Sequence, residues 1–233
     1  MSARARRILI IGNSDGIGAA VTTALIARGD TMVGVSRSPS PLGSDGPRHE
    51  VMDVTDAAYP ALLERLVRED GPFDACLYCV GIGSELELSD LSGEARVFEV
   101  NLTAMVRTLE VLTPQWLERR AGHFIGLSSA ADVLLNPGAP SYSASKAGFS
   151  NYLLGMGLRL RPYGIAVTNV RFGFIDTKMA KALKKPLMMT PDRAAVHLLR
   201  CLETRPMQRS VPRTVAMFVR AARCLQTVRV WFS

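Results

Sequence analysis

The sequence predicts a single α/β domain built on a doubly wound parallel sheet. Short apolar runs alternate with stretches of helical length from the start of the chain, which is typical of a parallel sheet covered by helices on both faces. The runs are mainly apolar, as expected for strands buried on both sides. A glycine-rich turn joins the first run to the first helix, as in the first unit of such a sheet. We expect one domain over residues 1–208, with residues 209–233 as a C-terminal extension of it.

The expected elements follow one another without an internal repeat or a domain linker. The predicted strands cover residues 7–11, 31–36, a short run near 51, 73–80, 123–128 and 165–171. The predicted helices cover residues 17–28, 56–69, 93–119, 141–160 and 191–203. Residues 38–47 have the proline, glycine and serine content of a loop. Residues 209–211 are expected to form a short last strand before Pro212, and an amphipathic helix is expected to follow it.

The composition is that of an ordinary globular protein. Of the 233 residues, 48% are hydrophobic and 21% are charged, and this length suits one domain with a substantial core. No apolar run approaches the roughly 18 residues that a membrane-spanning helix needs. The basic start, residues 1–7, precedes an apolar stretch of only residues 8–11, which is too short for the core of a signal peptide. We therefore expect a cytoplasmic protein.

The four cysteines do not predict a metal site. Cys76 and Cys79 have the spacing of a metal-binding pair, but they fall on a predicted buried strand, where residues three apart point to opposite faces. No second cysteine pair completes a zinc site, and Cys201 and Cys224 are interpreted as helix packing residues. We therefore predict that the protein binds no metal.

Positive charge is concentrated at the C-terminal end of the chain. The formal net charge is +7, and six arginines but no acidic residue follow Glu203. Nothing here resembles a nucleic-acid recognition module, so nucleic acid is not expected as a partner. Within residues 209–226 the apolar side chains and the arginines fall on opposite sides of a helix. Two interpretations stay open: the helix covers an apolar surface of its own domain or of a partner subunit, or it makes a peripheral contact with an anionic membrane.

The turn after the first strand has the glycine spacing of a phosphate-binding loop. Its glycines permit a sharp turn and the close approach of a phosphate, and the helix that follows offers free N–H groups. The Gly-x-x-x-Gly-x-Gly spacing resembles the short-chain dehydrogenases/reductases, and further motifs extend this resemblance over roughly residues 7–203. The resemblance implies a Rossmann-type fold and a nicotinamide cofactor. The turn residues expected to contact that cofactor are Gly12, Ser14, Asp15, Gly16, Ile17 and Gly18.

The end of the second strand predicts which nicotinamide cofactor is preferred. An acidic residue there would bind the ribose 2′-hydroxyl of NAD, but this chain has Ser36 followed by Arg37. A guanidinium binds a 2′-phosphate in bidentate fashion, so NADP(H) is favoured over NAD(H). Cys79 and Phe172 depart from the family, which has asparagine and proline at these two positions. The further cofactor contacts that the resemblance implies are Asp53 and Val54 near the adenine, Gly81, and Gly173, Ile175 and Thr177 near the nicotinamide.

Four residues form the expected catalytic set. Tyr142 and Lys146 lie four apart on a predicted helix and therefore share one face. A free tyrosine has a pKa of about 10, and a nearby ammonium favours its phenolate. Ser129 ends the fifth strand, 13 residues before Tyr142, and resembles the family's catalytic serine, which would hold the substrate oxygen. Asn101, a poor helix former within a long predicted helix, resembles the family's asparagine that bends this helix and holds a water in a proton relay with the lysine.

These features predict an NADP(H)-dependent oxidoreductase that transfers a hydride between nicotinamide and a small carbonyl or alcohol substrate. We expect a carbonyl reductase or alcohol dehydrogenase, and the methionines near the end of residues 178–189 favour an apolar substrate. The alternative is a non-catalytic NADP-binding regulatory protein on the same fold. An epimerase or dehydratase of sugar nucleotides would use the same tyrosine and lysine, but the short C-terminal half argues against it. The helices that begin near residues 93 and 141 resemble the family's subunit interface, so a homodimer is expected.

Overall fold

A seven-stranded sheet forms the centre of the protein. The computed structural model describes residues 5–43, 46–178 and 188–212, together with residues 214, 217, 221–224 and 226. The strand order is β3-β2-β1-β4-β5-β6-β7, and every neighbouring pair is parallel. The strands are β1 (Arg7–Ile11), β2 (Thr31–Ser36), β3 (His49–Val51), β4 (Ala75–Tyr78), β5 (Gly122–Ser129), β6 (Ile165–Phe172) and β7 (Gln208–Val211). The predicted doubly wound α/β fold is confirmed, and the strand order reverses between β1 and β4.

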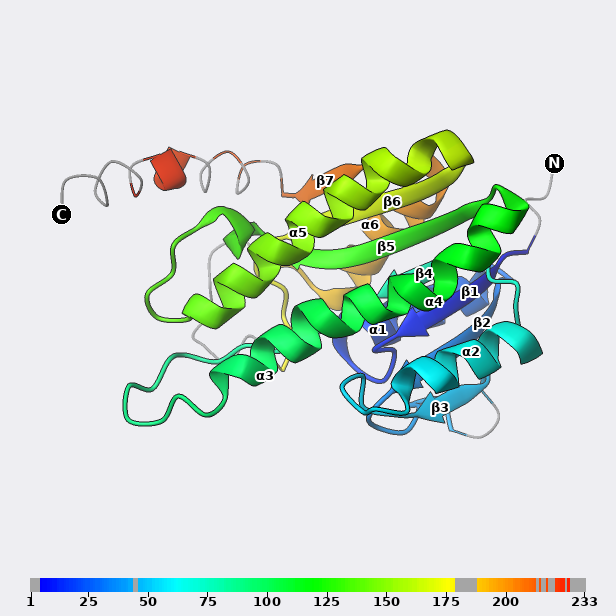
Figure 1. Ribbon diagram of the computed structural model, residues 1–233, viewed down its shortest axis with the longest axis horizontal. Helices are drawn as coiled ribbons and strands as arrows, with labels where there is room; N and C mark the ends of the chain where they lie inside the picture. Colours follow the sequence, from blue (N-terminus) through cyan, green and yellow to red (C-terminus); the bar gives the residue numbers. More distant parts are fainter. Residues whose placement is uncertain are drawn as a thin grey trace.

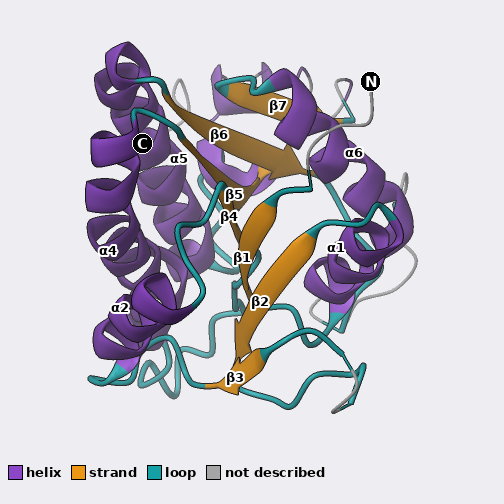
Figure 2. Cartoon of the chain, turned by 90° about the vertical axis from the view of Figure 1, so that its right-hand side faces the viewer, coloured by secondary structure: helices purple, strands orange, loops and turns teal. Residues whose placement is uncertain are grey.

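Helices cover both faces of this sheet (Figure 1). They are α1 (Gly16–Ala27), α2 (Tyr59–Glu69), α3 (Glu94–Phe98), α4 (Ala104–Arg119), α5 (Pro140–Leu160) and α6 (Pro191–Thr204). Figure 2 shows the sheet between α2, α4 and α5 on one side and α1 and α6 on the other. Each face has its own cluster of buried apolar side chains, centred on residues such as Tyr59 and Trp116 on the first side and Val21 and Leu198 on the second. This three-layer arrangement leaves the carboxyl ends of the strands as the edge at which loops can form a site.

Two helices differ from their predicted bounds by more than one residue. The helix predicted from residue 56 begins at Tyr59, because the Asp56 carboxylate accepts a hydrogen bond from the N–H of Ala58 (2.8 Å) and forms a turn before the helix. The long helix predicted over residues 93–119 is interrupted by a π-helical turn over Glu99–Thr103, which separates α3 from α4 and contains Asn101. A π-turn inside an α-helix is often found at a functional site.

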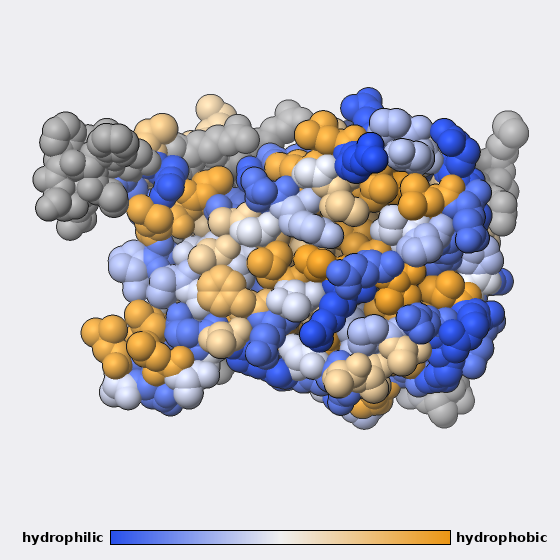
Figure 3. Space-filling model, viewed as in Figure 1, coloured by the Kyte–Doolittle hydropathy of each residue, from blue (hydrophilic) through white to orange (hydrophobic). Residues whose placement is uncertain are grey.

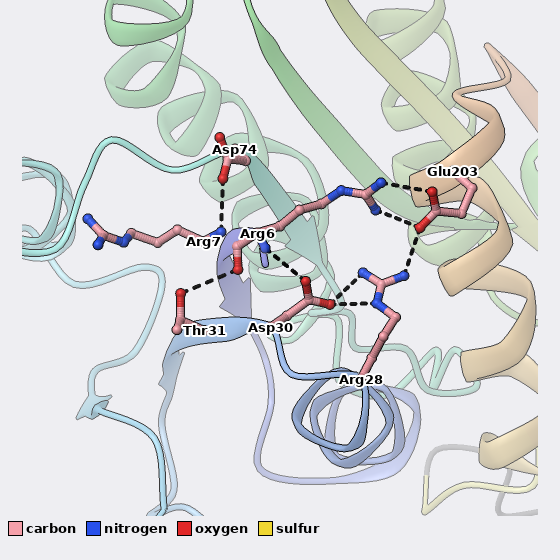
Figure 4. Close-up of polar contacts among 7 residues, drawn as sticks. All are labelled: Arg6, Arg7, Arg28, Asp30, Thr31, Asp74 and Glu203. Atoms are coloured by element: carbon pink, nitrogen blue, oxygen red, sulfur yellow. Dashed lines mark hydrogen bonds and ion pairs between the residues drawn. The ribbon is translucent and has the colours of Figure 1, made fainter. Parts of the chain in front are cut away.

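A network of ion pairs closes the amino-terminal edge of the sheet (Figure 4). Arg6 and Arg28 both pair with Glu203 at the end of α6, at 2.8 and 2.9 Å. Arg28 also pairs with Asp30 at 2.5 Å, and Asp30 accepts a hydrogen bond from the backbone N–H of Arg6 (2.9 Å). The network therefore joins the start of β1, the end of α1 and the end of α6, at the edge opposite the phosphate turn.

The C-terminal extension lies largely outside the described residues. Its first part forms β7, as expected, and residues 221–224 are helical. The side chain of Gln226 exchanges two hydrogen bonds with the backbone of Leu135, of 2.9 and 2.7 Å. Docking or membrane contact by residues 209–226 stays a prediction. Among the described residues, no helix has the length and apolarity that crossing a membrane requires.

Candidate active site

Three glycines shape the turn between β1 and α1. Gly12 has a φ of +87° and Gly16 a φ of +52°, which are left-handed conformations that side chains rarely adopt. A Cβ added to Gly18 would lie 1.8 Å from the carbonyl oxygen of Gly12, so only glycine lets the helix start this close to the turn. Ser14 is half-buried within the turn, and Ile17 packs on the apolar cluster beneath α1. The turn thus provides a cradle, free of Cβ atoms at these points, that fits a cofactor pyrophosphate at the amino end of α1.

The predicted nicotinamide segment lies against this turn. A Cβ added to Gly16 would lie 3.1 Å from the side chain of Thr177, although the two residues are far apart in the sequence. Lys178 pairs with Asp15 at 2.9 Å, and Asp15 also caps α1 by accepting a hydrogen bond from the N–H of Gly16. The Lys178 ammonium and this N–H lower the pKa of the Asp15 carboxyl.

Gly173 and Ile175 belong to the same segment as Thr177. The N–H of Gly173 bonds to Val211 of β7, and Ile175 pairs with Met189. The cofactor contacts predicted in the glycine turn after β1 and those predicted in the segment after β6 therefore lie close together.

The end of β2 places Arg37 at the surface and Ser36 inside the protein. The Ser36 hydroxyl donates to the carbonyl of Ser38 (2.8 Å), and a ring nitrogen of His49 lies 3.0 Å from the same carbonyl. These contacts hold the short turn that carries Arg37. An arginine on an ordered turn at this strand end fits the predicted recognition of a 2′-phosphate.

Asp53 has partners that the sequence did not reveal. One carboxylate oxygen accepts hydrogen bonds from the backbone and the hydroxyl of Thr55, and the other pairs with Arg96 of α3 at 2.8 Å. Val54, beside it, is buried. The turn after β3 is therefore ordered at the sheet edge where an adenine contact is predicted.

The loop after β4 passes directly over the predicted catalytic helix. A Cβ added to Gly81 would lie 3.2 Å from the Lys146 ammonium nitrogen, and one added to Gly83 would lie 2.5 Å from the Tyr142 ring. Asn101, fully buried in the π-turn, accepts a hydrogen bond from the N–H of Ile82 (2.8 Å) and donates to the carbonyl of the same residue (2.9 Å). Its amide also donates to the Ser145 hydroxyl of α5 (3.0 Å), so the asparagine fixes this loop against α5.

The carboxyl end of β5 meets the first turns of α5 at three residues: Ser129 on β5, and Tyr142 and Lys146 on α5. Burial, the largest effect, raises the pKa of the Tyr142 phenol above its ordinary value, and the neighbouring Ser129 opposes this change. The lowering expected from Lys146 is therefore not found. Lys146 is buried, donates to the carbonyl of Leu127 (2.9 Å) and lies 4.9 Å from the centre of the Phe149 ring. Burial lowers the pKa of Lys146 to about 8. The three groups combine a protonated phenol, a hydroxyl beside it and a lysine that titrates near neutral pH.

Sequence reasoning missed a second polar cluster behind Ser129. The buried Asp132 and the largely buried Arg171 form an ion pair, with Ser128 and Ser150 next to it. The signal was present, because Arg171 is the one charged residue of β6, and a charged residue in a strand of the sheet's interior needs a partner. Its partner could not be named, because the pairing depends on the register of β5, β6 and α5.

The structure buries Cys76 and Cys201, leaves Cys79 partly buried and exposes Cys224, so the interpretation of Cys224 as a packing residue is wrong. Burial raises the pKa of the Cys79 thiol to about 12, so this thiol is protonated at neutral pH and a poor metal ligand. No group of three or more His, Cys, Asp or Glu side chains in the described part of the chain is arranged to hold a metal ion.

The fold and the site together define a Rossmann-type protein with a dinucleotide cradle beside a serine, a tyrosine and a lysine. Residues 6–187 match the family model described as short chain dehydrogenase. The chain is 29% identical over 193 residues to the 3-oxoacyl-(acyl-carrier-protein) reductase FabG of Salmonella typhimurium, covering 78% of this chain and 79% of that protein. It is 30% identical over 211 residues to an uncharacterized oxidoreductase of Myxococcus xanthus, covering 83% of this chain and 82% of that protein.

Solved structures show the same fold. A short-chain dehydrogenase from Streptomyces avermitilis superposes with a TM-score of 0.83 at 23% identity, covering 97% of this chain and 94% of that one. A short-chain dehydrogenase from Sphingobium yanoikuyae, solved in complex with NADPH, has a TM-score of 0.82 at 22% identity, covering 97% of this chain and 95% of that one. The chain belongs to the short-chain dehydrogenase/reductase family. It is accordingly an oxidoreductase that uses a nicotinamide cofactor.

Proposed function

We propose that this protein is an NADP(H)-dependent reductase that transfers a hydride between nicotinamide and the carbonyl carbon of an apolar substrate, or catalyses the reverse reaction on the alcohol. The observation that carries the proposal is the convergence of Ser129, at the end of β5, with Tyr142 and the buried Lys146 of α5, beneath the loop that contains Gly81 and Gly83. A binding protein without chemistry has no need for a phenol and a lysine tuned in this way.

Each of the three side chains has its own role in the proposed reaction. Ser129 holds the substrate carbonyl oxygen and stabilises the negative charge that develops on it. Tyr142, kept protonated by burial, donates its hydroxyl proton to that oxygen. Lys146, with its pKa lowered to about 8, provides a positive charge that favours the resulting phenolate. The bound cofactor supplies the hydride from its nicotinamide ring.

Preference for NADP(H) rests on Ser36 and Arg37. The strand end carries no carboxylate that would repel a 2′-phosphate, and the exposed guanidinium can bind one in bidentate fashion. The Sphingobium yanoikuyae relative that binds NADPH supports the same preference.

An acyl thioester with a 3-oxo group is the first substrate class to test. Several relatives are named 3-oxoacyl-(acyl-carrier-protein) reductases, at 28 to 30% identity. Two large apolar residues follow the strands that carry the site: Leu135, 44% exposed, comes after β5, and Phe174, 45% exposed, comes after β6. Apolar side chains at this position suit a substrate with an acyl chain.

The experiment is a carbonyl panel with NADPH, in which loss of the reduced cofactor is followed by absorbance. The panel contains a 3-oxoacyl thioester, aliphatic ketones of increasing length and an aromatic ketone. We expect saturable oxidation of NADPH with at least one apolar carbonyl. Binding of NADPH without turnover on any substrate would contradict the proposal and favour the regulatory alternative.

We also propose that the protein forms a homodimer through α4 and α5. These helices lie side by side on one face (Figure 1), and Figure 3 shows hydrophobic residues between polar ones on that face. Leu117 of α4 and Leu158 of α5 are 38% and 66% exposed, so both helices offer an apolar side chain to a second copy. Light scattering at micromolar concentration should give the mass of a dimer, and a monomer alone would refute this.

A further inference from the structure

A buried ion pair lies directly behind the predicted catalytic serine. Asp132 follows Ser129 in a single 3-10 turn, Ala130–Val133, and its side chain has no exposed surface. The Nε atom of Arg171, on β6, lies 2.5 Å from Oδ2 of Asp132. Ser150 of α5 donates its hydroxyl hydrogen to the same carboxylate oxygen. The carboxylate therefore ties the turn to both of the elements that pack against it.

The ion pair of Asp132 and Arg171 is an unfavourable choice if stability is its only role. Burying two charges costs desolvation energy that their attraction often fails to recover, and apolar side chains of the same size would pack as well. In addition, Oδ1 of Asp132 is buried and has no hydrogen-bond partner among the described residues. A buried acceptor without a partner lowers stability further. Costly polar groups concentrated beside a reacting centre point to a role in the reaction.

The turn that Asp132 holds also orients Ser129. The hydroxyl of Ser129 accepts a hydrogen bond from the N–H of Ala131 (3.1 Å), within the same turn. A shift of the turn would therefore move the oxygen that meets the substrate. Ser128, the neighbour of Ser129 on β5, is anchored too, because its hydroxyl lies 2.7 Å from the hydroxyl of Ser150.

The carboxylate also acts on the charges of the site. Its titratable and charged neighbours are Arg171 on β6, and Lys146 and Tyr142 on α5; Cys79, after β4, acts on Lys146 as well. Burial lowers the pKa of Lys146, and the negative charge of Asp132 opposes that change. The same charge raises the pKa of Tyr142, in addition to the larger effect of burial. Burial raises the pKa of Asp132 itself, and its bonds to Ser150 and Arg171 oppose that change. The ionised carboxylate favours the protonated forms of both groups.

We propose that Asp132 is a positioning residue for the reaction, which orients the Ser129 turn through its bonds to Arg171 and Ser150 and places a negative charge behind the site. This inference rests on the proposed reaction, and its tests are chosen so that one of them does not depend on turnover.

The first test is a titration of Lys146 in the full chain by NMR. The chain has only five lysines, so the methylene signals next to their ammonium groups can be assigned with a Lys146→Met variant. In Asp132→Asn the titration midpoint of Lys146 should fall below that of the wild type, because the carboxylate that favours the ammonium is gone. An unmoved midpoint would overturn the electrostatic part of the proposal, whatever the enzyme catalyses.

The second test is the kinetics of the same variant. Loss of the bonds from Asp132 to Arg171 and Ser150 should lower kcat by about 100-fold, the effect of a misplacement of about 1 Å at the reacting centre. The affinity for NADPH should change little. Asp74→Asn is the matched control, because it removes a carboxylate that pairs with Arg119 (3.0 Å) before β4, far from the site. The control should keep the wild-type kcat and the wild-type midpoint of Lys146. Wild-type kcat in Asp132→Asn would overturn the positioning role.

A double variant guards against failure to fold. Asp132→Asn alone leaves the Arg171 guanidinium buried without its partner, whereas Asp132→Asn with Arg171→Gln removes both charges and keeps polar groups of similar shape. If the single variant does not fold, the double variant should still show the lower midpoint of Lys146 and the lower kcat. A double variant with both wild-type values would contradict the proposal. If the wild type itself has no turnover on any carbonyl, the proposed reaction is wrong, and the midpoint still decides whether Asp132 controls the charge of Lys146.

Discussion

Replacing Asn101 by alanine tests the clamp that holds the glycine loop over the catalytic helix. The side chain makes three hydrogen bonds, two with the backbone of Ile82 (2.8 and 2.9 Å) and one with the hydroxyl of Ser145 (3.0 Å). Each contributes about 1 kcal/mol, and Asn101 has no exposed surface from which water could replace them. Asn101→Ala should therefore lower the free energy of unfolding by about 3 kcal/mol. For a chain of this length the melting temperature should fall by roughly 6–12 °C.

The assay is urea unfolding of both proteins at one concentration, since assembly would otherwise shift the apparent stability. Asn151→Ala, which truncates an exposed asparagine of α5, is the control and should change stability by less than about 0.5 kcal/mol. Turnover should also fall in Asn101→Ala, because the freed loop carries Gly83 against the Tyr142 ring. A stability loss no larger than that of the control, with unchanged turnover, would refute the clamp.

Two further predictions concern the cofactor and the ion-pair network. Arg37→Asp should lower the ratio of kcat/KM for NADPH to that for NADH by at least about tenfold, because a charge-assisted hydrogen bond is replaced by repulsion. The control Arg68→Asp, on α2, should leave this ratio unchanged. An unchanged ratio in Arg37→Asp would show that another group binds the 2′-phosphate. Glu203→Gln should cost up to about 1 kcal/mol at neutral pH, because Glu203 is 51% exposed. Its hydrogen bond with Arg6 lowers the pKa of Glu203 below the ordinary 4.5, so the ion pair stabilises the fold above that pH and ceases to do so in acid. Unfolding at a series of pH values should show the wild type and the variant converging in acid, and a difference that persists there would contradict the assignment.

Local pattern was sufficient for most of the fold. The bounds of β2 agree with the prediction, because an apolar run there is limited by Asp30 on one side and a proline-rich loop on the other. The interruption at Glu99–Thr103 was not predictable in its π-helical form, since a single extra residue in a turn leaves the apolar spacing almost unchanged. The asparagine inside that helix was the one visible sign of it.

The site was predictable where its residues follow spaced motifs. Ser129, Tyr142, Lys146 and Asn101 are brought to one edge of the sheet, although their catalytic roles remain predictions. Contacts between elements that are distant in the chain could not be predicted from the sequence. The pairing of Asp132 with Arg171 requires β5 and β6 to align Ser128 with Arg171, and no local pattern specifies that register.

The contact between Asp53 and Arg96 was missed for the same reason. It joins the turn after β3 to α3, two elements that are separated in the chain by α2 and β4. A sequence predicts such a contact only when the packing of both elements is already known.

The central claim is that the Tyr142 hydroxyl transfers the proton, and Tyr142→Phe tests it most directly. The variant keeps the ring that packs against Gly83 and removes only the hydroxyl beside Ser129. With the best carbonyl of the panel, we expect a fall in kcat of at least about 100-fold, while the dissociation constant for NADPH, measured by fluorescence, stays within a few-fold of the wild-type value. Wild-type turnover by Tyr142→Phe would contradict the account.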